Sequence, residues 1–435
     1  MNFGLLHPAD QLVLIMNRIY SRGMTTTTGG NLSVLDDDGD IWITPSGIDK
    51  GSLTRDDMCR VKPNGSVTGP YKPSVELPFH SSVYRRRPDL RAMVHAHPPC
   101  LVAFSIARRL PDVHLVAGYR DILGTIALAP YAVPGSEILG NFIATEFERG
   151  YNAVVMENHG LCVGSGSLLR AFNVFETLES AAALELSARK LGTPVSLADT
   201  DIEETSTHKQ GLMDEQGLMD EFVPDKHSSE EKAARRDMIK LIRRSYEHGL
   251  LCSTQGVFSI VLSDGSFLIT PHGSDRAYMD ESDLVLVQDG KREISKAPSR
   301  SVGLHQAIYR KHSGIRSIIG AAPPNAMAFA VTDALFDPLT IPESYIVLRN
   351  VQRVPFRAAR QDPDLVAGLL SDKAPVLICE NDQILATGAS PLSAFDRLEV
   401  MEATARSILA ARDLGGVVSI SEREAHEIDI AFDLL

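Results

Sequence analysis

The feature that most constrains the fold of this chain is an internal repeat. The heptapeptide Ile-Trp-Ile-Thr-Pro-Ser-Gly at 41–47 returns as Phe-Leu-Ile-Thr-Pro-His-Gly at 267–273. Further matches follow in the same order and at a nearly constant offset: Gly23 and Gly249, Gly30 and Gly256, Pro73-Ser74 and Pro298-Ser299, His80 and His305, Pro98-Pro99 and Pro323-Pro324, and Glu157-Asn158 and Glu380-Asn381. Chance does not produce such an ordered series, so we interpret the chain as a tandem duplication of one domain of about 200 residues.

The boundaries of the two copies follow from composition. Residues 196–230 are polar and acidic, and they contain one hexapeptide twice in succession, at 210–215 and 216–221. We therefore predict a domain at 1–195, an acidic linker, and a second domain at 231–435. The linker is interpreted as mobile, and the alternative is a short helix that docks its Leu-Met pairs.

Within each copy, hydrophobic periodicity predicts a mixture of helices and strands. Helices are expected at 9–21, 78–87, 135–149 and 168–191, a hairpin at 31–35 and 40–44, and strands at 91–97 and 153–156. Hairpins and helices around a sheet indicate a layered domain. The predicted fold class is α/β, with two tandem layered α/β/α domains.

Composition excludes several classes of partner. The 435 residues carry a net charge of −13, which argues against nucleic acids and anionic membranes as partners. No apolar run approaches the roughly 20 residues of a membrane span, and the first eight residues lack the pattern of a signal peptide. Five scattered cysteines without a CxxC pair indicate reduced thiols, so we expect a cytoplasmic protein.

Three histidines in the first copy are candidate metal ligands. His95 and His97 lie two residues apart at the end of a predicted strand, where side chains at i and i+2 share a face. Taken alone, this pair is also compatible with histidines that fill the surface or the core. His159 follows the apolar strand predicted at 153–156, and three histidines with an open fourth position form the usual catalytic zinc arrangement.

The second copy serves as an internal control for these residues. It carries Gly320, Ala322, Asp382 and Ser301 at the positions of His95, His97, His159 and Glu76. The four residues are lost together while neighbouring prolines and the Glu-Asn pair persist, which is the pattern expected of one shared function. His80 is kept as His305, so we interpret His80 as structural.

Several motifs of the first copy together resemble a known family. They are Gly29-Gly30-Asn31-Leu32-Ser33, Ile43-Thr44-Pro45-Ser46-Gly47, Pro73-Ser74-Val75-Glu76, Arg87-Pro88-Asp89, Val94-His95-Ala96-His97, Ala129-Pro130-Tyr131 and Asn158-His159-Gly160. In this order they resemble the class II aldolase/adducin family, in particular the group typified by L-fuculose-phosphate aldolase. The resemblance covers 9–191, whereas 235–412 match in framework only, so the second copy is interpreted as a degenerate domain of the class II aldolase type.

The resemblance also implies roles for individual residues. Zinc, or another divalent metal, would be bound by His95, His97 and His159, and Glu76 would remove or return a proton at the nucleophilic carbon. The structural alternative for Glu76 is an acid at a helix N-terminus. The family's phosphate pocket maps onto Gly30, Asn31, Ser46, Gly47 and Ser74. Val75 stands where the family has a second serine, so the resemblance leaves open whether the substrate is phosphorylated.

The function implied is a zinc-dependent lyase. The leading hypothesis is aldol cleavage of a small sugar or hydroxy-carbonyl compound through a metal-stabilised enediolate, whose charge needs a Lewis acid. Leu115 occupies the position of the family's proton-donating tyrosine, so a decarboxylase or a sugar-phosphate 4-epimerase is the alternative. A third reading, an adducin-like interaction module, suits the second copy better than the first.

The resemblance has a consequence for assembly. Single-domain relatives are implied to form fourfold rings, so two tandem chains would close a pseudo-fourfold ring as a homodimer. Each active site would then lie at a domain boundary. Tyr345 could serve as an acid and Arg349 as an anion clamp, both contributed by the partner domain. The alternative is that these two side chains only pack or are solvated.

Overall fold

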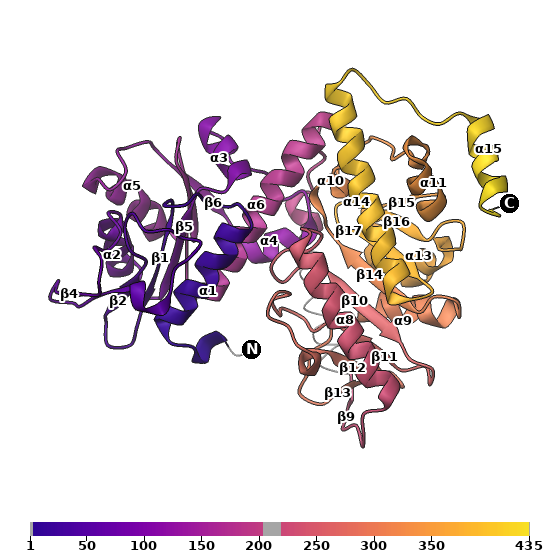
Figure 1. Cartoon of the computed structure of the whole chain (residues 1–435), viewed down its shortest axis with the longest axis horizontal. Coiled ribbons are helices and arrows are strands. Elements are labelled where there is room, and N and C mark those ends of the chain that lie inside the picture. Colours follow the sequence, from indigo (N-terminus) through magenta and orange to yellow (C-terminus); the bar gives the residue numbers. More distant parts are fainter. Residues whose placement is uncertain (1–2, 203–218, 435) are drawn as a thin grey trace. The chain divides into compact units, whose positions relative to one another are not determined.

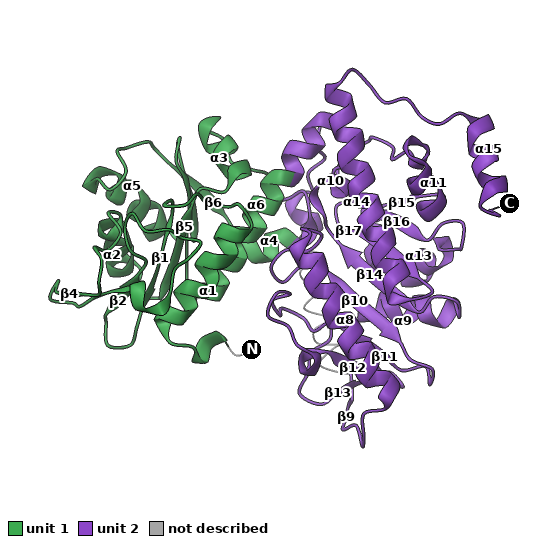
Figure 2. Ribbon diagram, in the orientation of Figure 1, with its two compact units in different colours: residues 1–113, 119–183 green, residues 114–118, 184–435 purple. Residues whose placement is uncertain are grey.

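The computed structural model describes residues 3–202 and 219–434. The chain forms two compact units, which Figure 2 distinguishes by colour. Unit 1 comprises Met1–Val113 and Tyr119–Ala183, and unit 2 comprises His114–Gly118 and Leu184–Leu435. The hexapeptide repeat that was predicted to be mobile lies, up to residue 218, outside the described residues.

Unit 1 is built on one eight-stranded sheet. Its strands are β1 (Asn31–Leu35), β2 (Ile41–Ile43), β3 (Cys59–Val61), β4 (Val67–Thr68), β5 (Ala92–Ala96), β6 (Ile126–Ala129), β7 (Ala153–Met156) and β8 (Gly160–Ser165). Their order across the sheet is β4-β3-β2-β1-β5-β8-β7-β6. The pair β6–β7 is parallel and the other neighbouring pairs are antiparallel.

Helices cover both faces of this sheet. They are α1 (Pro8–Ser21), α2 (Leu77–Arg86), α3 (Pro99–Ile106), α4 (Ala117–Leu123), α5 (Glu137–Glu148) and α6 (Leu168–Leu191), with 3-10 helices η1 (Phe3–Leu5) and η2 (Arg55–Asp57). Helices α2 and α5 lie on one face, and α1 and α6 lie on the other (Figure 1). Phe79 and Val83 of α2 pack with Ile143 and Phe147 of α5 and with Met93 of β5 in a buried core.

Helix α1 shows how the sequence specifies these elements. Leu12, Ile15, Met16 and Ile19 recur at helical spacing and are fully buried, so one face of the helix packs on the sheet. Pro8 occupies the first turn, where its missing N–H costs no hydrogen bond. The structure therefore confirms the helix predicted at 9–21.

Unit 2 contains the second sheet. Its strands are β9 (Glu221–Phe222), β10 (Val257–Val261), β11 (Phe267–Ile269), β12 (Val285–Gln288), β13 (Lys291–Glu293), β14 (Ser317–Ala321), β15 (Gln352–Val354), β16 (Val376–Cys379) and β17 (Gln383–Gly388). Their order is β15-β16-β17-β14-β10-β11-β12-β13-β9. The pairs β15–β16 and β13–β9 are parallel, and the other pairs are antiparallel.

The helices of unit 2 also lie on both faces of their sheet. They are α8 (Ser229–Glu247), α9 (Val302–Lys311), α10 (Pro324–Ala330), α11 (Pro342–Leu348), α12 (Phe356–Gln361), α13 (Pro363–Leu369), α14 (Pro391–Asp413) and α15 (Glu422–Ala431), with η3 (Glu281–Asp283) and η4 (Pro338–Thr340). Helices α8 and α14 share one face, and α9 and α13 pack together on the other (Figure 1). Within the described residues, no helix is long and apolar enough to cross a membrane.

The two sheets share one topology. Read from the opposite edge, β13-β12-β11-β10-β14-β17-β16-β15 repeats the order of unit 1, and β9 is an addition at the edge. The register agrees as well, because Asn31 faces His95 in unit 1 where Val257 faces Gly320 in unit 2. The structure confirms the tandem duplication and the α/β fold class.

One segment of the first copy belongs to unit 2. Residues His114–Gly118 are part of that unit, where the side-chain Nδ2 of Asn381 donates to the carbonyl of Leu115 (2.9 Å) and to that of Val195 (2.8 Å). The backbone N–H of Ala117 donates in turn to the carbonyl of Asn381 (3.0 Å). The structural units are therefore not simply the two halves of the sequence, and the division at residues 195 and 230 stays a prediction.

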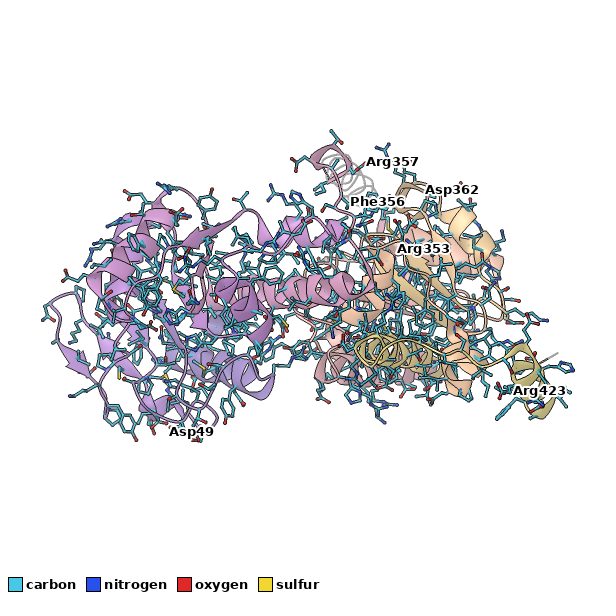
Figure 3. All side chains as sticks on the ribbon, turned by 90° about the horizontal axis from the view of Figure 1, so that it is seen from above. Asp49, Arg353, Phe356, Arg357, Asp362 and Arg423 are labelled. Atoms are coloured by element: carbon cyan, nitrogen blue, oxygen red, sulfur yellow. The ribbon has the colours of Figure 1, made fainter. Side chains whose placement is uncertain are left out.

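The start of the predicted linker is ordered against unit 2. Leu197 and Ile202 are buried with Ala117 and Phe356 in a small apolar cluster. Phe356 lies next to Arg357 at the first turn of α12 (Figure 3), and Arg357 forms an ion pair of 2.8 Å with Asp201. These contacts hold residues 196–202 on the surface of the second unit.

Candidate metal centre

Strand β5 positions the first two histidines. His95 is a fully buried residue of β5, with Asn31 of β1 and Cys162 of β8 as its neighbours across the sheet. His97 follows the end of the strand, immediately before the two prolines at which α3 begins. Because the two residues are separated by one position in an extended segment, their side chains share a face.

A tight turn positions the third histidine. His159 lies between β7 and β8, and the preceding Asn158 takes a left-handed conformation with φ of 55°. Strand β8 pairs with β5, so that Leu161 faces Ala96. The turn therefore brings His159 beside the end of β5.

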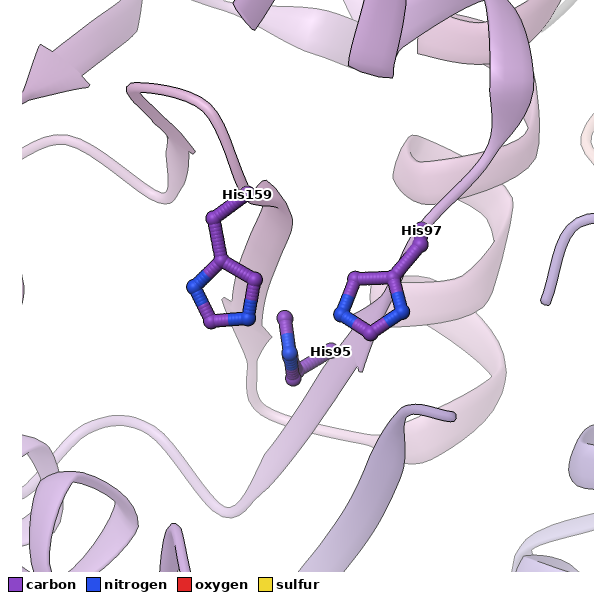
Figure 4. Close-up of side chains that lie close together, drawn as sticks. All are labelled: His95, His97 and His159. Atoms are coloured by element: carbon purple, nitrogen blue, oxygen red, sulfur yellow. The ribbon is translucent and has the colours of Figure 1, made fainter. Parts of the chain in front are cut away.

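The three imidazoles form a compact triangle (Figure 4). Their ring centroids are 5.0 Å apart for His95 and His97, 4.9 Å for His95 and His159, and 5.1 Å for His97 and His159. One nitrogen of each ring lies within 4.8 Å of those of the other two. This spacing allows the three nitrogens to reach one ion, so the structure brings together the three predicted ligands.

The nitrogens of this triangle fit a cation. The Nδ1 of His95 donates to the carbonyl of Leu161 (2.9 Å), which leaves its Nε2 for the cluster. The Nε2 atoms of His95 and His97 are buried without a hydrogen-bond partner among the described residues. The Nε2 of His159 also faces the cluster, and its Nδ1 points away from it (Figure 4). Buried nitrogens of this kind are costly unless they are bound, and three imidazoles with open coordination suit a divalent transition metal such as zinc.

Glu76 lies against the same cluster. It is the residue before α2 and only 6% exposed. Its Oε2 accepts from the side-chain Nδ2 of Asn31 (2.7 Å) and lies 3.2 Å from the Nε2 of His95, while its Oε1 lies 3.7 Å from the Nε2 of His159. A carboxylate is thus held beside the predicted metal ligands.

The electrostatics of the cluster keep the carboxylate of Glu76 ionised and two of the imidazole rings neutral. Burial raises the pKa of Glu76, but His95, Asn31 and His159 together outweigh burial, and the net pKa falls well below its usual range. Burial and then the charge of His95 lower the pKa of His97 to about 3 and that of His159 to about 4. Both rings are consequently neutral at physiological pH, which is the form that ligates metals.

A cavity of about 390 Å³ opens onto these groups. Its lining includes Glu76, His97 and His159 together with all five residues of the predicted phosphate pocket, which are Gly30, Asn31, Ser46, Gly47 and Ser74. Gly30 has φ of 72°, and a Cβ there would stand 2.7 Å from the carbonyl of His95, so the close approach of the two backbones requires glycine. Val75 also lines the cavity and is 67% exposed.

Lys50 is a cavity residue that the sequence analysis missed. It is 2% exposed, and its Nζ donates to the carbonyl of Pro45 (2.6 Å). Burial lowers the pKa of its ammonium to about 8. Its counterpart in the repeat is Arg276, also buried, so a charge kept in both copies was the available signal.

Tyr345 and Arg349 lie in unit 2, where both side chains contact helix α15. The hydroxyl of Tyr345 donates to the carboxylate of Asp429 in α15 (3.0 Å), and Arg349 forms an ion pair of 3.0 Å with the same carboxylate. Arg349 also donates to the carbonyl of Leu434 (3.0 Å). Their contribution to an active site stays a prediction.

The corresponding place in unit 2 is filled by other side chains. The side chain of Gln383 lies where a Cβ on Gly320 would stand. Asp382, at the position of His159, forms an ion pair with Arg360. The described part of unit 2 contains no cluster of three metal-ligating groups.

Comparisons with known proteins agree with the duplication. The family model of the class II aldolase and adducin N-terminal domain matches residues 10–186 and again 236–409. The 5-deoxy-D-ribulose 1-phosphate aldolase of Bacillus thuringiensis serovar kurstaki is 30% identical over 205 residues, which are 46% of this chain and 95% of the relative.

Two further proteins are similar to the chain. The 3-oxo-tetronate 4-phosphate decarboxylase of Pectobacterium atrosepticum is 33% identical over 178 residues, which are 40% of this chain and 81% of the relative. A solved structure of an L-fuculose 1-phosphate aldolase is 32% identical, covers 47% of this chain and 96% of its own, and has a TM-score of 0.42.

Proposed function

This chain belongs to the class II aldolase and adducin family, and on that premise we propose that it is a metal-dependent lyase that cleaves a carbon–carbon bond beside a carbonyl group. The observation that carries the proposal is one cavity lined by the buried carboxylate of Glu76 and by His97 and His159. The ring of His95 completes the cluster, with its centroid 5.0 Å from that of His97 and 4.9 Å from that of His159. A proton-transfer group beside a cation site is what cleavage to an enediolate requires.

The metal would be held by His95, His97 and His159, and zinc is the ion that this donor set favours. When bound, a divalent cation supplies electrostatic stabilisation of the negative charge that develops on the substrate oxygens. Unit 1 contains the three-histidine cluster and the described part of unit 2 contains no such cluster, so we propose one ion per chain. Elemental analysis of the purified protein tests this stoichiometry, and two tightly bound ions per chain would contradict it.

Glu76 would transfer the proton. Its carboxylate is ionised and is oriented by the hydrogen bond from Asn31, so it can accept a proton from substrate or return one to the enediolate carbon. Lys50 would provide positive charge for an anionic end of the substrate, together with the hydroxyls of Ser46 and Ser74, and would offset the loss of a hydroxyl at Val75.

The proposed substrate is a small sugar phosphate or hydroxy acid. The test is a screen of the zinc-loaded chain against 5-deoxy-D-ribulose 1-phosphate, L-fuculose 1-phosphate and 3-oxo-tetronate 4-phosphate. Release of an aldehyde identifies an aldolase. If all three compounds stay intact while the metal is bound, the proposed activity on this class of substrate is wrong.

Decarboxylation is a second candidate, supported by two observations. A similar protein is named a decarboxylase of a 3-oxo-tetronate 4-phosphate, and the position of the family's acidic tyrosine is taken by Leu115, which is buried in unit 2. Release of carbon dioxide from the same screen separates this reaction from aldol cleavage. A change of configuration without cleavage would instead indicate a sugar-phosphate 4-epimerase.

We propose in addition that two chains form a homodimeric pseudo-fourfold ring. Asn381 of unit 2 holds the segment at Leu115, and Asn158 is its counterpart on the cavity of unit 1. By the pseudo-symmetry of the repeat, Asn158 would receive the equivalent segment near Thr340 from a second chain. Mass in solution should then be twice 47.4 kDa, and a monomeric, fully active protein would contradict the ring.

The proposed cellular location and the proposed role of unit 2 rest on the cysteines and on the contacts of unit 2. The five cysteines are free, which supports a cytoplasmic location, and unit 2 would act as a partner domain in the manner of an adducin-like interaction module. Expression of residues 1–200 alone tests the need for unit 2, since unit 2 holds the segment His114–Gly118. We expect that fragment to be inactive or to aggregate.

A further inference from the structure

A chain of buried hydrogen bonds leads away from Glu76 into unit 1. The Nδ2 of Asn31 lies 2.7 Å from Glu76 Oε2, and the Oδ1 of Asn31 lies 2.6 Å from the Nε2 of His80. The Nδ1 of His80 lies 2.6 Å from the Oγ of Ser33, which lies 2.7 Å from the hydroxyl of Tyr84. All five side chains belong to buried residues, so water does not compete for these bonds.

The direction of every bond in this chain is determined. A carboxylate only accepts, so the amide of Asn31 donates from Nδ2 and presents its oxygen to His80. That oxygen also only accepts, so the Nε2 of His80 donates to it. Burial lowers the pKa of His80 to about 3, and the neutral ring therefore accepts at Nδ1 from the hydroxyl of Ser33. The single proton of the Tyr84 hydroxyl then points to Ser33, whose Oγ lies at 2.7 Å and whose backbone carbonyl lies at 3.2 Å.

Unit 2 keeps the inner part of this chain and has lost the outer part. The Oγ of Ser259 lies 2.7 Å from the Nδ1 of His305 and 2.6 Å from the hydroxyl of Tyr309, as in unit 1. The position of Asn31 is Val257, and the Nε2 of His305 has no hydrogen-bond partner among the described residues. The Ser-His-Tyr group is thus present in unit 2, where no carboxylate corresponds to Glu76. The link from this group through an asparagine to a carboxylate occurs in unit 1.

From this difference we propose that His80 is a positioning residue, which acts through the amide of Asn31 to fix the carboxylate of Glu76. The donor on Nε2 prevents the amide from turning its oxygen toward Glu76, where two acceptors would repel each other. Asn31 is then primarily a support for the carboxylate, and less a ligand of a substrate anion. The proposal rests on the proposed function insofar as Glu76 is the proton-transfer group.

The competing explanation is that His80 only stabilises the fold. The ring of His80 stacks on that of Phe79 at 4.3 Å and completes the core between α2 and β1. His305 occupies the same place in unit 2 and is equally buried. Matching changes at the two histidines remove the same buried ring and its bond to a serine, whereas the stack on Phe79 and the bond to Asn31 are lost only at His80. The test therefore compares the effects on kcat, and not the effects on stability alone.

The first arm of the test needs no substrate. In the full chain with ¹⁵N-labelled histidine, the Nε2–H signal of His80 should differ from that of His305, because only the first has an acceptor. Asn31→Val, which copies unit 2, should move the His80 signal toward that of His305, and Glu76→Gln should shift it as well. Ser301→Ala should leave both signals in place. A His80 signal that ignores both Asn31→Val and Glu76→Gln would overturn the link.

The second arm measures turnover of L-fuculose 1-phosphate and 5-deoxy-D-ribulose 1-phosphate. We expect His80→Leu to lower kcat roughly 10-fold with little change in KM, and His305→Leu to lower the melting temperature without lowering kcat. In the Asn31→Val background, His80→Leu should lower kcat no further, because its route to Glu76 is already cut. Equal kcat losses in the two histidine variants, or full additivity with Asn31→Val, would make His80 purely structural.

The two arms separate the possible failures. If neither compound is turned over but the His80 signal responds to Asn31→Val, the proposed activity fails and the hydrogen-bond link stands. If His80→Leu does not fold, the ¹⁵N signal of His80 in Asn31→Val, compared with that in the wild type, still tests the hydrogen-bond link. We expect Asn31→Val to fold, because valine occupies the matching position of unit 2.

Discussion

Units 1 and 2 share one sheet topology but carry different side chains at the positions of the histidine cluster. The strand order, the parallel edge pair and the Ser-His-Tyr group occur in both. The differences concentrate where β5 or β14 ends, where histidines in one unit correspond to glycine, alanine and aspartate in the other. The comparison teaches that the three-histidine cluster is not needed to hold this fold, because unit 2 builds the same sheet with other residues at those positions.

The sharpest test of the comparison removes one ligand. We expect His97→Ala to abolish both stoichiometric metal binding and activity, since a three-histidine site cannot lose a ligand and keep its ion. Metal content and turnover should be measured on the same preparation. The matched control is Ala322→Ser, at the counterpart of His97 in unit 2, which should change neither quantity. Full metal content in His97→Ala would show that the ligands are elsewhere.

The next largest effect is expected at the carboxylate. Glu76→Gln keeps the shape of the side chain and removes the proton acceptor, so turnover should fall by roughly 10² or more. Metal content should stay near one ion per chain. Ser301→Ala, the matching change in unit 2, should leave turnover as in the wild type. Loss of metal with little loss of rate would make Glu76 a ligand instead.

A smaller effect is expected at the buried lysine. The pKa of Lys50 is lowered to about 8, so its charge is present below that pH and is lost above it. Binding of sulfate, whose own charge is constant in this range, should weaken by roughly tenfold between pH 7 and pH 9.5. Calorimetric titration at the two pH values measures this change.

Two variants separate charge from structure at this position. Lys50→Met should bind sulfate weakly at both pH values. Arg276→Met removes the matching cation of unit 2, whose guanidinium donates to the carbonyls of Gly256 and Ser274, so it should lower stability and leave sulfate binding unchanged. If Lys50→Met binds sulfate with the same pH dependence as the wild type, the titrating group is a residue other than Lys50.

The smallest expected effect is on stability, at Asp382, which occupies the position of His159 in unit 2. Asp382 and Arg360 form a partly buried ion pair in unit 2, and Asp382→Asn should remove about 1 kcal/mol of stability. This corresponds to a fall of about 2–4 °C in the melting temperature. Activity and metal content should not change. An unaltered melting temperature would mean that the pair is only solvated.

Much of the fold follows from local pattern. Helix α1 was predicted at 9–21 and runs over Pro8–Ser21, because its apolar spacing and its proline are local signals. The strand expected at 91–97 is β5, Ala92–Ala96, which ends before His97 and the two prolines. The repeat pointed to the candidate metal ligands, because the three histidines are absent together from the second copy of the sequence.

The rest depends on contacts between distant residues. No local pattern distinguishes a buried lysine such as Lys50 from the common exposed one. His80 was interpreted as structural because it recurs as His305, yet the difference lies in its partner, since Asn31 is 49 positions away along the chain. The sequence likewise gave no sign that His114–Gly118 belongs to the second unit.

That exchanged segment bears on how the gene can change. A cut placed between the two repeats leaves His114–Gly118 on one fragment and Asn381, which binds it, on the other. Neither fragment then contains a complete structural unit. Recombination that removes the second repeat also removes the residues of unit 2 that bind His114–Gly118. The second copy keeps its sheet with other residues at the positions of the three histidines, but deletion of that copy would break the contacts of His114–Gly118.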